Sequence, residues 1–179
     1  MTHIDIFCRL GQALEALRPD DEVVLRACAE NPWFTPDSVC RAARALAREM
    51  LTRDRLEAWI ARYPALPAAA PRRVRIVMAG NIPMVGFLDL LCVLMAGHRA
   101  EVKYSSKDRT LMRWIVDRLQ EAGLPVEETE GAIDAVIATG GESATRHFRA
   151  QYAAIPALLR GSRQSVAVLS GGGTGEELH

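Results

Sequence analysis

The feature that most constrains the fold is a change of hydrophobic period after residue 73. VRIVMA (74–79) is a short β-branched apolar run, PMVGFLDLLCVLMA (83–96) is long and apolar nearly all round, and AEVK (100–103) repeats the strand pattern. A strand, a buried helix and a second strand in this order are typical of a parallel sheet covered by helices. The sequence therefore predicts an α/β fold with a Rossmann-like parallel sheet flanked by helices.

The same alternation continues toward the C-terminus. A further helix is predicted to start at Asp108, whose side chain is expected to cap it, and to end at Gly123. The remaining predicted elements are a strand at 134–138, a polar turn, a helix through RHFRAQY and a last strand at 165–170. Residues 74–179 are therefore interpreted as a Rossmann-like nucleotide-binding domain.

Residues 1–63 have a helical pattern instead. Apolar residues recur at three- or four-residue spacing at Ile6, Leu10, Leu14 and Leu17. Thr35 followed by Pro36 combines an N-cap hydroxyl with a proline at the first helical position. PALPAAAPRR (64–73) has the composition of a linker, so we expect an N-terminal helical segment, a linker and then the sheet.

Charge and composition exclude several classes of partner. The chain has 22 basic and 22 acidic residues, so no overall field attracts nucleic acid or an anionic membrane. The longest apolar run contains Asp89 and is too short to cross a bilayer, and the N-terminus lacks the pattern of a signal peptide. We expect a soluble cytoplasmic protein with no nucleic-acid or membrane partner.

The cysteines and histidines do not indicate a metal site. Cys8, Cys28, Cys40 and Cys92 show no CxxC spacing, and the four histidines form no close cluster with them. Buried free thiols are the expected state of the cysteines.

Three polar turns follow three predicted strands: GNIP (80–83), KYSSKD (103–108) and TGGES (139–143). Parallel sheets bind ligands beyond the carboxyl ends of their strands, where helix N-termini and unpaired N–H groups converge. We therefore expect the three turns to meet at one edge and to surround one ligand.

In the first turn, Gly80 allows the chain to reverse and Pro83 is expected to start the next helix. Asn81 would then present its amide at the ligand end of the sheet, where it could donate to a developing oxyanion. The alternative is that Asn81 only caps the helix.

The second turn contains both lysines of the chain, Lys103 and Lys107, while every other basic residue is an arginine. With Ser105 and Ser106 as neutral donors, this turn suits a phosphate or ribose contact. The alternative is a solvated loop whose Asp108 caps a helix.

The third turn offers hydroxyls at Thr139 and Ser143, and Gly140 and Gly141 would let the backbone approach a pyrophosphate. Glu142 acts against this, because its carboxylate would repel a phosphate.

Two further features have structural and functional interpretations: Asp89 is either paired or a functional carboxylate, and the arginines from Arg146 to Arg163 are either a solvated face or coenzyme contacts.

In this order the three turns resemble the nucleotide-binding domain of the aldehyde dehydrogenase superfamily. The segments GNIPMVGFLDLL, AGHRAEVKYSSKD, DAVIATGGESATRHF, RGSRQSVAVLSGG and ENPWFTPDSV resemble the LuxC-type acyl-CoA reductases. The resemblance implies an enzyme that reduces an acyl-CoA or other acyl thioester to an aldehyde with NADPH, through a thioester on an enzyme cysteine. It also implies that Asn81 holds the oxyanion and that the turn at Lys103 and Ser105–Lys107 contacts the adenosine ribose. Thr139–Ser143 would lie before the helix that faces the pyrophosphate.

NADPH is preferred over NADH because no carboxylate follows Ser105 and Ser106 directly to hold a free 2′-hydroxyl, whereas Lys107 could meet a 2′-phosphate. Glu101 in a strand and Glu142 depart from the family pattern. Leu169 stands where hydrolytic aldehyde dehydrogenases have a glutamate base, which suits a reductase that must spare its thioester.

No cysteine of the chain matches the family nucleophile, which would follow beyond His179. We therefore expect the chain to be inactive alone. Two other hypotheses stay open: a non-catalytic nucleotide-binding or assembly module of the same fold, and an unrelated Rossmann-like enzyme such as a methyltransferase. The sequence leaves acyl chain length and homo-oligomer formation undetermined.

Overall fold

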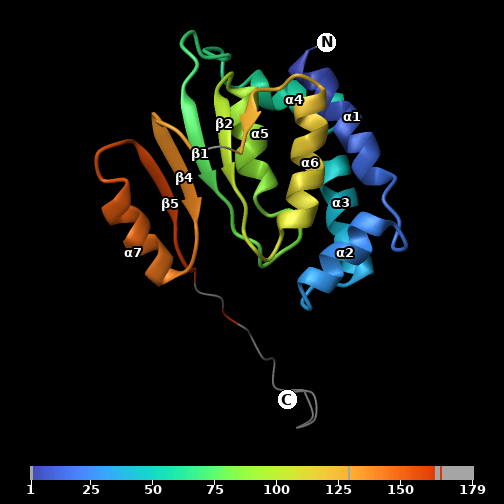
Figure 1. Ribbon diagram of the computed structural model, residues 1–179. Helices are drawn as coiled ribbons and strands as arrows, with labels where there is room; N and C mark the ends of the chain where they lie inside the picture. The colour runs from blue at the N-terminus through green and yellow to red at the C-terminus, as the bar shows by residue number, and fades with distance from the viewer. Residues whose placement is uncertain (1, 129, 164–165, 167–179) are drawn as a thin grey trace.

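A five-stranded, all-parallel sheet organises the protein, in the strand order β3-β2-β1-β4-β5 (Figure 1). The computed structural model describes residues 2–128, 130–163 and 166. In chain order the elements are α1 (His3–Glu15), α2 (Glu22–Glu30), α3 (Pro36–Met50), α4 (Arg53–Ile60), β1 (Arg73–Val77), α5 (Phe87–Met95), β2 (Arg99–Lys103), α6 (Arg109–Glu121), β3 (Val126–Glu127), β4 (Ala135–Thr139), α7 (Glu142–Gln151) and β5 (Ala157–Arg160). The predicted α/β fold with a Rossmann-like parallel sheet is confirmed.

The strand order reverses at the centre of the sheet. From β1 the chain passes through α5 to β2 and through α6 to β3 on one side, whereas β4 and β5 are added on the other side of β1. The crevice at such a reversal is where open parallel sheets bind ligands. The junction of β1 with β4 is therefore the place to look for a site.

The two faces of the sheet are covered by different helices. Val74 and Ile76 of β1 are buried in the main core, which they share with α5 and α6. The side chains of β4 that point the other way, Val136 and Ala138, pack in a smaller cluster with Phe148 and Tyr152. Because side chains alternate along a strand, α7 covers the face opposite to α5 and α6.

The N-terminal helices α1–α4 pack on the outer side of α5 and α6 (Figure 1). Ile6, Leu10, Leu14 and Leu17 are all buried, as their spacing predicts. Phe7 of α1 meets Phe87 of α5 edge to face, with ring centroids 6.3 Å apart. The helical segment and the sheet thus share one hydrophobic core.

A buried ion-pair network explains the charged residue inside β2. Glu101 is only 2% exposed, and its Oε1 lies 2.5 Å from Arg75 Nε. Its Oε2 lies 3.1 Å from Arg73 Nη2 and accepts a hydrogen bond of 3.1 Å from the N–H of Gly131. Parallel register places Arg75 directly beside Glu101, so the charges on neighbouring strands compensate each other.

Several boundaries differ from the sequence predictions. The helix after β1 begins at Phe87 and has Gly86 at its N-cap, so the prediction that Pro83 starts it is wrong. β3 and β5 were not predicted, because two and four residues are too few to show a period. The strand predicted at 165–170 lies outside the described residues, apart from Val166.

All four cysteines are free. Cys40 is buried, but Cys8, Cys28 and Cys92 are only partly buried, which corrects the prediction of four buried thiols. Burial raises the pKa of each thiol above its ordinary value. None of the helices in the described ranges is long and apolar enough to span a membrane.

The Glu101 network generates a stability prediction. Glu101→Gln should lower the free energy of unfolding by about 3–5 kcal/mol, because it leaves the largely buried Arg75 guanidinium uncompensated. Urea denaturation measures this difference. Glu15→Gln, which breaks the exposed ion pair with Arg48, serves as the control and should cost at most about 1 kcal/mol. Equal losses in the two variants would contradict the argument.

Candidate functional site

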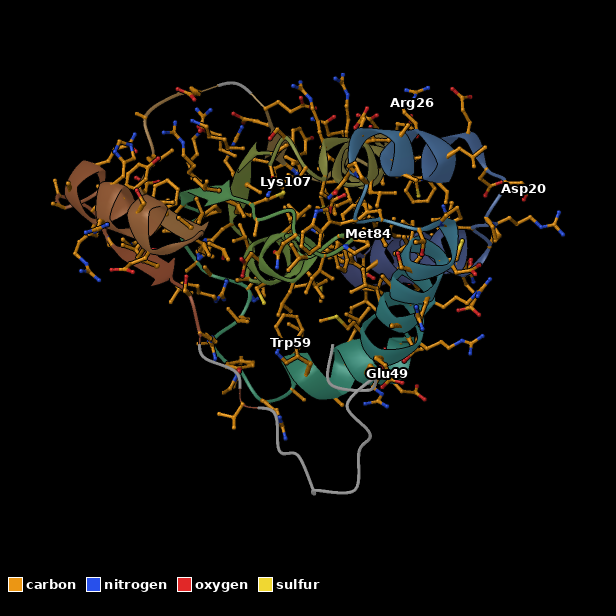
Figure 2. The ribbon with its side chains drawn as sticks, turned by 90° about the horizontal axis from the view of Figure 1, so that it is seen from below. Asp20, Arg26, Glu49, Trp59, Met84 and Lys107 are labelled. Atoms are coloured by element: carbon orange, nitrogen blue, oxygen red, sulfur yellow. The ribbon has the colours of Figure 1, made fainter. Side chains whose placement is uncertain are left out.

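The turns that follow β1, β2 and β4 begin at the same edge of the sheet. Val77, at the end of β1, is in register with Lys103 of β2 and with Ala138 of β4. Figure 2 looks onto the molecule from below, the side on which the strand arrows of Figure 1 end, and shows Met84 and Lys107 near its centre. The three turns that the sequence singled out therefore share one edge.

The turns after β1 and β2 are in direct contact. A Cβ atom added at Gly80 would lie 2.5 Å from Ser105 Oγ and 3.0 Å from the backbone nitrogen of Asp108. Because real Cβ atoms do not approach other atoms so closely, only glycine fits at position 80. Gly80 is thus required for the packing of the two turns, whether or not it contacts a ligand.

Asn31, in the connection between α2 and α3, joins both turns from the N-terminal side. Its Nδ2 donates to the carbonyls of Gly80, at 3.3 Å, and Lys107, at 3.0 Å. Its Oδ1 accepts from the N–H of Trp33 at 3.0 Å, and Trp33 itself is 88% exposed. Sequence reasoning missed this residue, because an asparagine after a helix is an ordinary cap and nothing local marks it as buried.

Asp108 anchors the turn after β1. It occupies the position before α6, but its carboxylate makes no capping hydrogen bond to that helix, so the predicted cap is wrong. Instead Oδ2 accepts a 2.6 Å hydrogen bond from the N–H of Met84. Met84 has φ 59°, a left-handed conformation that costs a non-glycine residue about 1–3 kcal/mol and persists only when its surroundings impose it. The Asp108 carboxylate supplies that restraint.

Asn81 lies in this restrained turn with its side chain exposed. The helix that follows has Gly86 at its N-cap and no side-chain cap, so the interpretation of Asn81 as a helix cap is wrong. Among the described residues, no hydrogen-bond partner is seen for the Asn81 amide. Its role as an oxyanion donor stays a prediction.

A cavity of about 180 Å³ lies at the reversal between β1 and β4. Its lining comprises Ala79, Val85, Gly86, Leu88, Asp89, Thr139 and Arg160. Within it, Arg160 Nη1 donates to both carboxylate oxygens of Asp89, at 2.6 and 2.7 Å. Asp89 is therefore the paired carboxylate of the two predicted alternatives, and Arg160 is the member of the basic segment that reaches the crevice.

The two lysines lie near the crevice but do not line this cavity. Lys103 Nζ is 3.7 Å from Glu130 Oε1 on the connection between β3 and β4. The Ser105 hydroxyl accepts from the N–H of Lys107 at 3.2 Å, so it already serves its own turn. Ser106 and Lys107 are exposed, as is Lys103, so these three side chains of the turn are accessible to a ligand.

The turn after β4 is partly committed to the sheet. The N–H of Gly140 donates to the carbonyl of Arg160 at 3.0 Å, so it cannot also donate to a pyrophosphate. The N-cap residue of α7 is Gly141, which has no side chain to cap the helix. Glu142 and Ser143 are exposed in the first turn of α7. Thr139 is the predicted residue of this turn that reaches the cavity.

Comparisons with known proteins do not assign a family: no protein-family model and no curated protein matches the sequence. Nor does any group of three or more His, Cys, Asp or Glu side chains in the described ranges have the arrangement of a metal site.

The buried Asp108 predicts a pH dependence of stability. Burial raises its pKa to about 7, and the hydrogen bond from Met84 offsets this only in part. Since the folded pKa exceeds the unfolded value, the unfolded state binds fewer protons between about pH 4 and 7, and stability is lost as pH rises through that range. In Asp108→Asn this loss should disappear, so its free energy of unfolding, measured with urea at pH 5 and pH 8, should fall less than that of the wild type. An identical fall in both proteins would contradict the prediction.

Replacement of the two asparagines at this edge should affect the free energy of unfolding to different extents. Asn31→Ala should lower the free energy of unfolding by about 1–3 kcal/mol, because it removes the partners of three backbone groups. Asn81→Ala, at an exposed side chain, should change it by no more than about 0.5 kcal/mol. Thermal and urea denaturation of both variants test this, and a large loss in Asn81→Ala would assign that side chain a structural role.

Proposed function

We propose that the chain is the N-terminal and nucleotide-binding part of a LuxC-type acyl-CoA reductase, which reduces an acyl thioester to an aldehyde with NADPH. The observation that carries the proposal is the meeting of the three turns at the reversal of strand order, where Ala79 and Thr139 line one cavity and Gly80 contacts Ser105. Parallel sheets bind nucleotides at this position. The resemblance of these turns to the family supplies the reaction, and a cytoplasmic enzyme is part of the same proposal.

The described residues fit the adenosine end of a dinucleotide best. Ser106 and Lys107 are exposed beside the β2 exit, and an ammonium group there suits a 2′-phosphate. For the pyrophosphate, the available donors are the backbone N–H groups in the first turn of α7 and the guanidinium of Arg160, which also donates to Asp89. When bound, NADPH would supply the hydride.

Asn81 is the residue we assign to the reacting carbonyl. Its amide is exposed at the ligand edge, by which we mean the side of the sheet where the turns after β1, β2 and β4 begin. Its backbone is held by the restrained turn that ends at Met84. A preorganised amide can donate a hydrogen bond to an oxyanion without reorganising as charge develops. The nucleophilic cysteine would come from outside the residues at this edge.

Two carboxylates favour the alternative, a non-catalytic nucleotide-binding or assembly module. Glu142 lies in the first turn of α7, and Asp89 neutralises the Arg160 guanidinium in the cavity. Both lower the affinity of the edge for phosphate groups. The expected acyl-thioester substrate and a homo-oligomeric assembly stay predictions in either case.

Titration with NADPH and NADH, followed by nicotinamide fluorescence, tests the proposal. Lys107→Ala should weaken NADPH binding about 10- to 100-fold, the equivalent of one charge-assisted hydrogen bond, and should leave NADH binding nearly unchanged. Arg48→Ala, which removes an exposed positive charge from α3, is the matched control. Absence of NADPH binding at millimolar concentration, or binding unaltered in a Lys103→Ala, Lys107→Ala double variant, would refute it.

A further inference from the structure

The sheet face that carries α5 and α6 is not covered along its whole width. α5 lies over β1 and β2 and α6 lies beside β3, whereas α7 packs on β4 and β5 from the opposite face (Figure 1). Under α7, the β4 side chains of Val136 and Ala138 are buried. On the α5 face, Ala135 and Ile137 are only partly buried, and Leu158 of β5 is 50% exposed. In the part of the chain that the structure describes, no helix therefore shields β4 and β5 on the α5 face.

The order of the strands explains the missing cover. A crossover from one parallel strand through a helix to the next is right-handed in nearly all cases, so the direction in which the sheet grows fixes the face of the helix. The steps from β1 to β2 and from β4 to β5 run in opposite directions, and this places α5 and α7 on opposite faces. A further right-handed unit after β5 would again put its helix on the α7 face. A helix over the uncovered face would thus not come from a continuation of this pattern.

An apolar groove, which we call the open groove, runs along the uncovered face. One wall is the row of Leu88, Cys92 and Ala96, which lie four residues apart on one side of α5. Its floor includes Ile137 and Leu158, which are in register on β4 and β5. Three cavities meet along the row: about 400 Å³ next to α4, about 180 Å³ at the strand reversal and about 530 Å³ over β4 and β5. They adjoin one another, because Leu88 lines the first two and Cys92 lines the first and the third.

The open groove has the dimensions of one α-helix. Two neighbouring strands span about 10 Å, which is the diameter of a helix with its side chains. The five residues of β4 extend over about 16 Å, the length of about 11 helical residues. The small side chains of Cys92 and Ala96 on the wall and of Ala135 on the floor would let a helix approach closely.

The unpaired charges beside the open groove are positive. Glu49 and Asp89, the carboxylates that line the three cavities, are each paired with an arginine of the same lining. The arginines that remain are Arg62 and Arg72, which are exposed and make no ion pair within the described ranges. A partner with carboxylates beside its apolar stripe matches this distribution of charge.

We propose that the open groove binds an amphipathic α-helix of a partner protein, with an apolar stripe of about three turns against Leu88 and Leu158 and acidic side chains at Arg62 and Arg72. This helix would complete the α5 layer, since both faces of a parallel sheet are normally buried under helices. An apolar helix face that lies in a groove through residues i, i+3, i+4 and i+7 is a common mode of recognition. The inference stands without the proposed function, because it depends on no nucleotide contact.

A second copy of the chain suits the open groove less well. In a twofold dimer the same patch of both subunits forms the interface. Arg62 and Arg72 of one copy would then lie in the same interface as those of the other, and like charges across an interface lower affinity. The partner therefore differs from this chain and carries the opposite charge on its docking face.

Fluorescence anisotropy of a labelled synthetic peptide, titrated with the full chain, tests the proposal. The peptide has about 16 residues, with Leu and Ala at positions i, i+3, i+4 and i+7 and Glu elsewhere. We expect saturable binding, and Leu158→Glu should weaken it at least tenfold because the variant replaces an apolar contact with a charge. Leu25→Glu, at a leucine that is 51% exposed on α2, is the matched control and should leave binding unchanged. Leu88→Glu is the second groove variant, in case Leu158→Glu does not fold.

The charged contacts are tested separately. The Arg62→Gln, Arg72→Gln double variant should weaken binding of the Glu peptide about three- to tenfold, the equivalent of two exposed ion pairs. It should leave binding of the same peptide with Gln in place of Glu unaltered. A peptide with Lys in place of Glu should bind the unmodified chain more weakly than the Glu peptide does.

Three results would overturn the inference: no binding of the Glu peptide at millimolar concentration, equal affinity for a peptide of the same composition whose apolar residues are scattered around the helix, or equal losses in Leu158→Glu and Leu25→Glu. Sedimentation velocity of the chain alone checks for a second copy, and self-association that Leu158→Glu abolishes would assign the groove to a dimer instead. Titration of NADPH into the same samples keeps the two proposals apart. Peptide binding without NADPH binding would support this inference and remove the proposed function.

Discussion

The hydrogen bond from the Met84 N–H to the buried carboxylate of Asp108 is the interaction on which the ligand edge depends. It holds Met84 in a left-handed conformation, and this conformation delays the start of α5 to Phe87. The delay leaves Asn81 in an exposed turn and places Gly86 in the wall of the crevice. Burial of the same carboxylate opposes its ionisation, so the contact that holds this turn lowers the free energy of unfolding at neutral pH.

The N-terminal helices contribute to this edge as well as to the core. Asn31 connects the α2–α3 loop to the backbone of both the β1 and the β2 exits. A change in the packing of α2 would therefore move the two turns together. The helical segment thus acts as part of the support of the site, and its removal would leave the carbonyls of Gly80 and Lys107 without this partner.

How far the sequence could predict the protein depended on whether a residue acts locally. The stripe from Ile6 to Leu17 predicted a helical face, and Thr35 with Pro36 predicted a helix start, because both signals operate within a few residues. Pro83 suggested a helix start for the same reason and failed, because a carboxylate from another turn decides the conformation of Met84. β5 was missed because it has only four residues and because it is the outermost strand next to β4, where two of its side chains are exposed.

By itself, the sequence determined the α/β class, the order of most elements and the three polar turns at one edge, since hydrophobic period and the geometry of parallel strands are local rules. The tertiary structure alone decided which polar groups meet there: Asn31 with Gly80, Asp108 with Met84, and Arg160 with Asp89. It also decided that Trp59 of α4 and Leu88 and Leu91 of α5 line one cavity. The physical reason is that these contacts join residues 24 to 71 positions apart, and a contact at such separation leaves no periodic trace in the chain.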